Sequence, residues 1–355
     1  MRGLEFPIIG TKIPRLSKKF NLTSPKGRKE YFNVKAGEEI RTIGRYLRKS
    51  NFVAFLTGKK NSGKGTYAKL FTEIFGEEKV IHLSVGDLVR EYSTNWDSFV
   101  KTSSFAKLKN LYRGYVSFDE AVESLLARTT KTLLPTEFVL ALLKLRIGEL
   151  KGKSIFVDGL PRELDQVSYS LFFRDLAGYT DAPDFFVLID IPEAIIDERI
   201  KYRVVCPLCN TSRNKKLFPT SKVGYDSKKR DFYLLCDNPN CEGARMEKKE
   251  GDNLGLEPIR ERLTKDEEIL KSVFSLHGIA KILLRNHVGV SQASKYFDEY
   301  ELTPEYVFKW DEKARKVKVE EKSWIFKDDN GVESFSLLAP AVVVSMIKQL
   351  VEVLE

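Results

Sequence analysis

One loop of nine residues limits the folds open to this chain more than any other feature. Residues 58–66 read GKKNSGKGT, after an apolar run at 51–57 that is typical of a buried strand and before a helical stretch that begins at Lys64. Glycines let backbone N–H groups converge on phosphate oxygens, and a helix N-terminus adds partial positive charge. In such a loop Lys64 reaches the β- and γ-phosphates and Thr66 lies near Mg²⁺. The pattern predicts a nucleotide phosphate site, because an ordinary surface turn does not require this flanking strand and helix.

Strand and helix patterns alternate along most of the chain. Runs typical of buried strands occur at residues 51–57, 79–83, 154–157, 185–189 and 279–284. Helical patterns are found from residue 64 and at 99–131, 136–150, 192–203 and 258–274. This alternation predicts an α/β fold with a central parallel sheet that helices cover on both faces.

The last part of the chain has a different pattern. Short strands are expected at residues 306–310, 316–320, 324–327 and 332–337, followed by an amphipathic helix at 341–354. The Asn330-Gly331 pair is a strong signal for a hairpin turn. These residues are expected to form a small β-meander plus a helix, appended to the main domain.

The positive charge of the chain belongs to its N-terminal part. The formal net charge is +9, and residues 1–50 hold 13 Lys and Arg against 4 Asp and Glu, so the remaining 305 residues balance to zero. We interpret residues 1–50 as a solvated, partly mobile basic extension; the alternative, a contact with nucleic acid, is confined to this arm. The chain shows neither an apolar run long enough to cross a membrane nor a secretory signal pattern, so a cytoplasmic location is expected.

All four cysteines fall in one short window. Cys206 and Cys209 form one pair, and Cys236 and Cys241 form a second pair 26 residues later. Two such pairs can supply four thiolates to a tetrahedral Zn²⁺. A catalytic zinc needs an open position, so a structural zinc is predicted. Two disulfides or four reduced thiols are the alternatives, and the expected cytoplasmic location disfavours the disulfides.

Four further motifs resemble those of adenylate kinases, and they come in that family's order. They are residues 82–90 (HLSVGDLVR), 157–162 (VDGLPR) with Gln166 four residues on, 190–203 (DIPEAIIDERIKYR) and 252–263 (DNLGLEPIRERL). The resemblance covers about residues 51–298. It implies a P-loop nucleoside monophosphate kinase in which residues 84–134 form the monophosphate-binding lobe and 202–252 a zinc-ribbon lid. Residues 1–50 and 299–355 lie outside it.

The resemblance assigns roles to individual residues. Lys64 stabilises the transferred phosphoryl group, Arg90 and Arg162 hold the acceptor phosphate, and Arg203 and Arg262 close over the reacting phosphates from the lid. Arg199 stacks on the ATP base, and Asp158 orients Mg²⁺ through water. The expected ATP site comprises Gly58, Asn61, Ser62, Gly63, Lys64, Gly65, Thr66, Arg199 and Arg203. The expected AMP site comprises Val85, Arg90, Leu133, Leu134, Gly159, Arg162, Gln166, Lys249 and Arg262.

Phosphoryl transfer between two nucleotides does not need a general base. An acceptor phosphate is already ionised, so transfer needs positioning and charge neutralisation, which arginine and lysine side chains supply. ATP and AMP are the expected partners, Mg²⁺ and a structural Zn²⁺ the expected cofactors, and a monomer the expected state. A Gln166 amide can pair with both N1 and N6 of adenine.

Several residues depart from the family pattern. Val85 stands where adenylate kinases usually have Thr, Asn61 where they have Gly, and Lys249 where they have Arg. Lys cannot make the bidentate phosphate contact that Arg makes. A kinase for UMP, CMP or GMP therefore stays an alternative, and a nucleic-acid-binding ATPase or regulator is a second alternative from a different class.

Overall fold

The computed structural model describes residues 3–127, 134–150, 152–164, 166–167, 183–209, 211–248 and 252–355. A five-stranded parallel sheet lies at its centre, in the order β10-β4-β1-β3-β2. The strands are β1 (Val53–Gly58), β2 (Val80–Ser84), β3 (Ser154–Asp158), β4 (Asp184–Asp190) and β10 (Lys281–Arg285). All five predicted strands are confirmed, and so is the α/β fold class. Every residue of β1 is buried, as expected of a central strand in a covered parallel sheet.

Side chains of β1 alternate between two hydrophobic cores. Ala54 and Leu56 belong to the core that contains α2 (Lys64–Phe75), whereas Val53 and Phe55 belong to the core on the opposite face. Helices α7 (Thr136–Glu149) and α11 (Arg260–Ser275) contribute to this second core. Helices therefore cover both faces of the sheet around β1.

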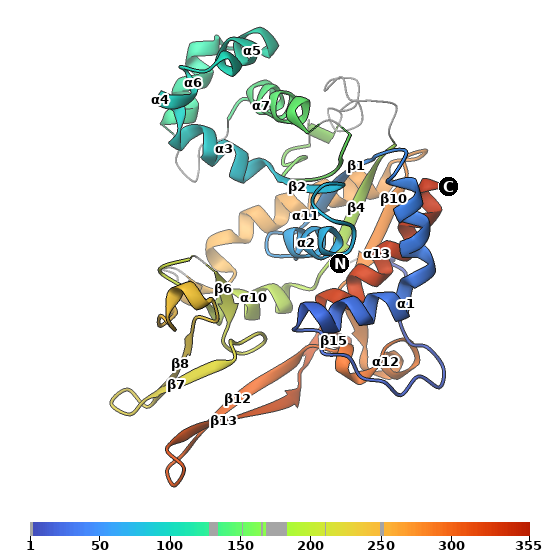
Figure 1. Ribbon diagram of the computed structural model, residues 1–355, viewed down its shortest axis with the longest axis vertical. Helices are drawn as coiled ribbons and strands as arrows, with labels where there is room; N and C mark the ends of the chain where they lie inside the picture. The colour runs from blue at the N-terminus through green and yellow to red at the C-terminus, as the bar shows by residue number, and fades with distance from the viewer. Residues whose placement is uncertain are drawn as a thin grey trace.

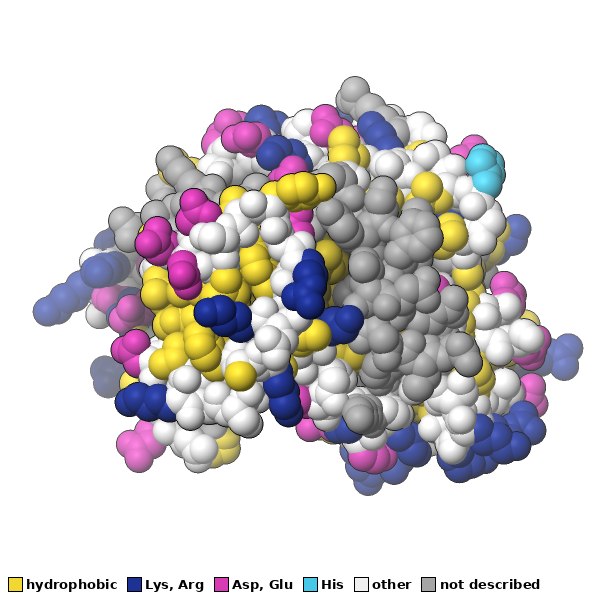
Figure 2. Space-filling model, turned by 90° about the horizontal axis from the view of Figure 1, so that it is seen from above, with side chains coloured by type: hydrophobic (Ala, Val, Ile, Leu, Met, Phe, Trp, Pro, Cys, Tyr) yellow, Lys and Arg dark blue, Asp and Glu magenta, His cyan; other side chains and the backbone are white. Residues whose placement is uncertain are grey.

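A helical lobe follows β2. It consists of α3 (Val85–Thr94), α4 (Trp96–Phe99), α5 (Ser103–Leu111), α6 (Phe118–Leu126) and α7. The helical pattern predicted at residues 99–131 is broken into separate helices, and a capping box of Ser117 and Glu120 starts α6. In the view from above, hydrophobic side chains gather in the part of the molecule where this lobe lies, and Lys and Arg side chains lie next to them (Figure 2).

A second peripheral unit lies between α10 (Glu193–Lys201) and α11. It contains two small antiparallel sheets, one of order β6-β5-β9 and the other of β7 and β8. The strands are β5 (Arg203–Val205), β6 (Ser212–Asn214), β7 (Lys222–Asp226), β8 (Asp231–Leu235) and β9 (Glu247–Lys248). Short 3-10 turns follow at Pro239–Cys241, Asp252–Leu254 and Glu257–Ile259. We call residues 202–252 the lid.

The C-terminal strands and helix are confirmed, but the strands divide into two units. β12 (Pro304–Asp311) and β13 (Lys316–Ser323) form a separate ribbon, whereas β14 (Ile325–Lys327) and β15 (Glu333–Ser336) join β11 (His287–Gly289). Helix α12 (Val290–Tyr296) and a 3-10 turn at Glu299–Glu301 precede the ribbon. Helix α13 (Ala339–Leu354) packs beside α1 and β10 (Figure 1), and Ala341, Val342, Val343 and Val344 are fully buried in the core with α2. The helix is thus part of the main core.

The ribbon lies against the lid. The ring of Trp310 on β12 stacks on Tyr225 of β7, with ring centroids 4.8 Å apart and an interplanar angle of 18°. Phe308 contacts Phe232 of β8 in a tilted arrangement, with ring centroids 5.7 Å apart, and the Tyr306 N–H donates to the carbonyl of Lys216 at 2.7 Å. The two hairpins extend from the same end of the molecule in Figure 1.

The expectation of a solvated, partly mobile N-terminal extension is wrong for residues 25–46. Residues 25–46 form α1 (Pro25–Tyr46), which Ser24 caps through a hydrogen bond from the Gly27 N–H. The helix packs along α13, and Tyr31, Phe32 and Ile43 are buried in the same core as α2. Most charged residues of this helix are exposed, although Lys35 is buried in an ion pair with Asp298, so the composition of the segment hides its apolar face.

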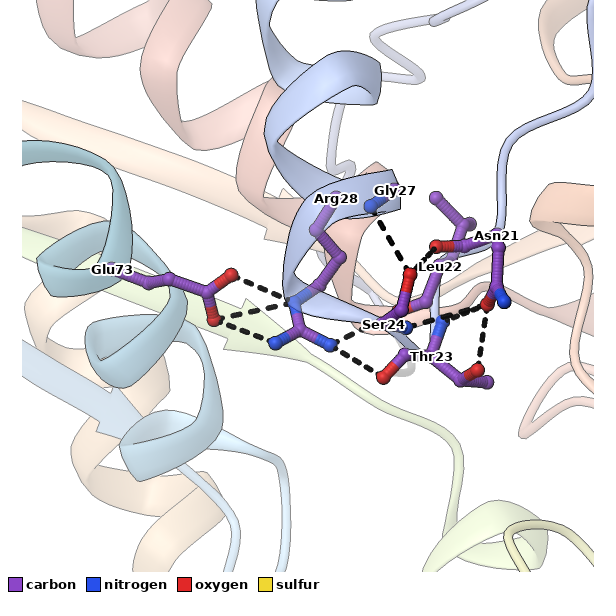
Figure 3. Close-up of polar contacts among 7 residues, drawn as sticks. All are labelled: Asn21, Leu22, Thr23, Ser24, Gly27, Arg28 and Glu73. Atoms are coloured by element: carbon purple, nitrogen blue, oxygen red, sulfur yellow. Dashed lines mark hydrogen bonds and ion pairs between the residues drawn. The ribbon is translucent and has the colours of Figure 1, made fainter. Parts of the chain in front are cut away.

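An ion pair joins the start of α1 to α2. The guanidinium of Arg28 makes hydrogen bonds of 3.0 and 2.8 Å to the two carboxylate oxygens of Glu73, and its other nitrogen donates to the Thr23 carbonyl at 2.9 Å (Figure 3). The Arg28 side chain is only 16% exposed. A bidentate, half-buried pair of this kind stabilises more than an exposed one.

Among the described residues, the helices are too short or too polar to cross a lipid bilayer.

Replacing Arg28 by Ala should destabilise the fold by about 1–2 kcal/mol, because the Glu73 carboxylate and the Thr23 carbonyl lose their donors. Urea unfolding measures the change. Arg41→Ala is the matched control on the same helix, since its pair with Glu38 is 3.9 Å long and exposed; its effect should stay within about 0.5 kcal/mol. Equal effects of the two substitutions would contradict a structural role for the Arg28 pair.

Candidate active site

The glycine-lysine loop has the strand and helix that the sequence predicts on either side of it. It leaves the end of β1 and enters α2, whose N-cap is Gly63 with φ 105°. Asn61 has φ 65°, a left-handed conformation that Asn tolerates better than most residues. The ammonium of Lys64 folds back to donate hydrogen bonds to the carbonyls of Gly58 at 2.9 Å and Lys59 at 3.2 Å. Ser62, Gly65 and Thr66 complete the loop, and Thr66 is exposed at the start of α2.

Positive side chains converge around Lys64. Burial is the main cause that lowers the pKa of Lys64, and the guanidinium groups of Arg262 and Arg162 lower it further, against the opposing carboxylates of Asp158 and Asp266. These cations come from three different elements: α2, the segment after β3, and α11. An anion placed among them is stabilised by all three.

Asp158 provides a carboxylate that faces the Lys64 ammonium. It ends β3, and its oxygens lie 3.9 Å from the Lys64 ammonium and 3.7 Å from Nε2 of His82 on β2. Burial alone would raise the pKa of Asp158, but the nearby His82 imidazole and the charge of Lys64 hold it below its ordinary value. The carboxylate is therefore ionised at neutral pH, as an oxygen group facing Mg²⁺ requires.

Arg162 and Gln166 lie next to each other in the segment that follows β3. The backbone N–H of Arg162 donates to Oε1 of Gln166 at 2.7 Å, and Nε2 of Gln166 donates to the hydroxyl of Thr136 at 3.0 Å. The Arg162 guanidinium lies against Gly159, where an added Cβ would come within 3.1 Å of Nη2. Gly159 also has φ 94°, so a side chain there is excluded on two grounds. Val85 is buried and packs at 3.4 Å from the same position.

Three arginines at the base of the lid have protein partners. Arg203 makes a bidentate pair with Asp252, with both bonds at 2.6 Å, which joins the first strand of the lid to its exit. Arg199 of α10 donates to the carbonyl of Asn61 at 2.8 Å, so it lies across the phosphate loop. Arg262 donates to Asp266 at 2.8 Å, and the other oxygen of Asp266 accepts the backbone N–H of Lys60 at 2.8 Å.

The remaining predicted residues are placed less directly. Arg90 is 63% exposed on α3 and pairs with Asp87 of the same helix, so its guanidinium faces its own first turn. Leu134 is half-buried against the hydrophobic core of the lobe. Leu133 and Lys249 lie outside the described residues.

Two contributors were not predicted from the sequence. Asp266 bonds both Arg262 and the loop, and it shows no motif of its own beyond being four residues after Arg262 on one helix. Lys59 looks like an exposed loop lysine, yet it is 1% exposed and lies 3.1 Å from Glu193 and 3.0 Å from Glu267. Only the fold brings these carboxylates together.

The four cysteines meet in the lid and could hold a metal ion. Their sulfur atoms all lie within 4.8 Å of one another, and those of Cys209 and Cys236 are 3.6 Å apart. That distance is far longer than a disulfide bond but close to the roughly 3.8 Å between two thiolates on a tetrahedral zinc. Cys206, Cys236 and Cys241 are buried and Cys209 is half-buried. All four are free thiols. The donor set thus fits a closed structural site of the predicted kind.

Comparisons with known proteins agree with this geometry. No family model matches the chain. An adenylate kinase of Kosmotoga olearia is 31% identical over 187 residues, covering 52% of this chain and 70% of the relative. An adenylate kinase of Clostridium acetobutylicum is 28% identical over 250 residues, covering 66% of this chain and 97% of the relative, and one of Clostridium tetani is 29% identical over 210 residues, covering 59% and 78%. The protein is a phosphotransferase of the nucleoside monophosphate kinase type. Within that class, the chain belongs to the adenylate kinase family.

Purified protein should contain about one zinc per chain, and Cys206→Ser should lose the zinc, because three thiolates leave a four-coordinate site open. The melting temperature should fall as well, since metal binding stabilises the folded lid. Elemental analysis and thermal melts measure both. Asn240→Ser, an exposed change between Cys236 and Cys241, should keep the metal. Zinc that persists in Cys206→Ser would contradict the assignment.

Proposed function

We propose that this protein catalyses the reversible transfer of the γ-phosphoryl group of ATP to AMP, giving two molecules of ADP. The observation that carries the proposal is the convergence of Lys64, Arg162 and Arg262 beside the phosphate loop, where burial and mutual repulsion lower the pKa of Lys64. Two polyanionic substrates relieve that repulsion as they bind, and the charge that develops during transfer is stabilised by the same groups. The relatives named adenylate kinase support the same reaction.

The residues divide the work by position. In the proposal, the loop N–H groups and Lys64 hold the ATP phosphates, and Arg162 holds the acceptor phosphate. The acceptor oxygen is already ionised, so positioning and neutralisation replace a general base. Mg²⁺ enters with ATP; Asp158, ionised and beside Lys64, and the exposed hydroxyl of Thr66 would face it and supply hard oxygen groups.

The lid contributes further positive charge. Arg203 and Arg262 are bonded to Asp252 and Asp266, and Arg199 to the loop carbonyl of Asn61. We propose that these carboxylates keep the guanidinium groups solvated and aligned until nucleotide phosphates compete for them. Arg90 is proposed to reach the acceptor phosphate when the lobe of α3–α7 closes, since its pair with Asp87 is solvent-exposed and therefore weak.

AMP is the acceptor that Gln166 favours. Gln166 is buried 2.7 Å from the Arg162 N–H, so one short segment can contact both the phosphate and the base of the acceptor. An amide offers the acceptor and donor that N6 and N1 of adenine need. Rates with ATP and a panel of AMP, GMP, CMP and UMP decide among the acceptors. The structural zinc, the cytoplasmic location and the monomeric state remain predictions.

Lys64→Met should lower turnover by at least about 100–1000-fold while the protein stays folded, because the removed cation acts on charge in the transition state. A coupled assay of ADP formation measures the loss. Lys69→Met, an exposed change on the same helix, is the control and should keep full activity. Near-normal turnover of folded Lys64→Met would refute the site.

Gln166→Leu should raise the KM for AMP by about 10–100-fold and leave the KM for ATP within about twofold, because it removes only hydrogen bonds to the acceptor base. Initial-rate kinetics with each substrate varied in turn measure both constants. Gln292→Leu, on the exposed face of α12, is the control. A change confined to the ATP constant would mean that the two nucleotide sites are assigned the wrong way round.

A further inference from the structure

A buried lysine in the phosphate loop bonds to the C-terminal segment. Lys59 directly follows β1, and its ammonium lies 3.1 Å from Glu193 on α10, 3.0 Å from Glu267 on α11 and 3.8 Å from Asp329. Asp329 belongs to the turn between β14 and β15, outside residues 51–298, where the sequence resembles adenylate kinases. A lysine that is 1% exposed is tolerated only when carboxylates compensate for the lost solvation.

Asp329 is one of three carboxylates that keep Lys59 charged. Burial tends to lower the pKa of Lys59, but the carboxylates raise it above its ordinary value. The ammonium therefore stays charged within the protein. The backbone carbonyl of Lys59 accepts hydrogen bonds from the Lys64 ammonium at 3.2 Å and from the Ser62 N–H at 3.0 Å. The position of Lys59 thus bears directly on the shape of the loop around Lys64.

The same carboxylate contacts the loop by a second route. Oδ1 of Asp329 accepts a hydrogen bond from the backbone N–H of Glu193 at 2.9 Å, in the first turn of α10. A negative charge at this end of a helix interacts favourably with the helix dipole. Further along α10, Arg199 donates to the carbonyl of Asn61 in the phosphate loop. Asp329 therefore acts on both Lys59 and the helix that carries Arg199.

The turn that presents Asp329 is itself well fixed. The carboxylate of Asp328 accepts the N–H groups of Asn330 and Val332, both at 2.9 Å, and Gly331 takes φ 81°. Trp324 and Phe326, just before the turn, are buried against Ile195 and Ile196 of α10. The turn is thus held against α10 by apolar packing as well as by the hydrogen bond.

We infer that Asp329 is a positioning residue for ATP: through Lys59 and the start of α10, it fixes the phosphate loop in the shape that receives the ATP phosphates. The inference rests on the proposed function for its reading of the loop as the ATP site. It assigns to the C-terminal segment a part in substrate binding that the resemblance to adenylate kinases does not supply.

Two substitutions separate the contacts of Asp329. Asp329→Asn keeps an oxygen for the Glu193 N–H but removes the charge facing Lys59, whereas Asp329→Ala removes both. We expect Asp329→Ala to raise the KM and the Kd for ATP by about tenfold and Asp329→Asn by about threefold, with the acceptor KM within about twofold of normal. Initial rates give the KM values, and calorimetry with ATP alone gives the Kd.

The control is Glu320→Gln, which removes one negative charge from the exposed pair with Lys309 in the same C-terminal segment. It should leave all constants unchanged. Lys59→Met tests the route through Lys59: Asp329→Asn keeps the oxygen for the Glu193 N–H, so the double variant Lys59→Met/Asp329→Asn should bind ATP within about twofold of Lys59→Met alone. Where Lys59→Met does not fold, as circular dichroism shows, Asp329→Asn alone decides the question.

Normal ATP binding by folded Asp329→Ala, or equal rises in the KM of both substrates, would overturn the inference. Additive losses in the double variant would overturn it as well. Failure of the proposed function looks different: wild-type protein would then form no ADP from ATP and AMP, while Asp329→Ala would still weaken ATP binding measured by calorimetry.

Discussion

The burial of Lys64 beside the phosphate loop, with Arg162 and Arg262 close by, is the constraint on which the rest of the site depends. Burial and these neighbours lower the pKa of Lys64, and only Asp158 and Asp266 oppose them among the groups that act on it most. Both carboxylates also face other parts of the site: Asp158 lies 3.7 Å from Nε2 of His82, and Asp266 accepts the Lys60 N–H. These two carboxylates therefore offset part of the cost of burying the Lys64 ammonium near two guanidinium groups.

The sequence predicted those parts of the molecule whose signals are local. The five strands, the loop at 58–66 and the four cysteines each show their pattern within a few residues, and the structure contains all of them. Helix α1 could not be recognised, because Tyr31 and Ile43 are few among many charged neighbours and become core residues only when α13 covers them. Lys59 was missed for the same reason, since its carboxylate partners lie more than 130 residues away.

Both ends of the chain meet at one buried carboxylate. Glu301 is fully buried; it accepts hydrogen bonds from the hydroxyls of Thr11 at 2.7 Å and Tyr31 at 2.5 Å, and Lys35 lies 3.8 Å away. A buried carboxylate of this kind is costly unless its oxygens are satisfied. Here the N-terminal residues satisfy them. The segments on either side of the kinase core therefore stabilise each other.

The contact between the ribbon and the lid has an optical consequence. The chain has three tryptophans; Trp96 lies in the helical lobe, Trp324 packs against α10, and Trp310 stacks on Tyr225 of the lid. The indole of Trp310 therefore changes its surroundings whenever the lid leaves the ribbon, and its fluorescence changes with them. With Trp96 and Trp324 replaced by Phe, the emission of the protein becomes an intrinsic reporter of lid position, without any attached dye.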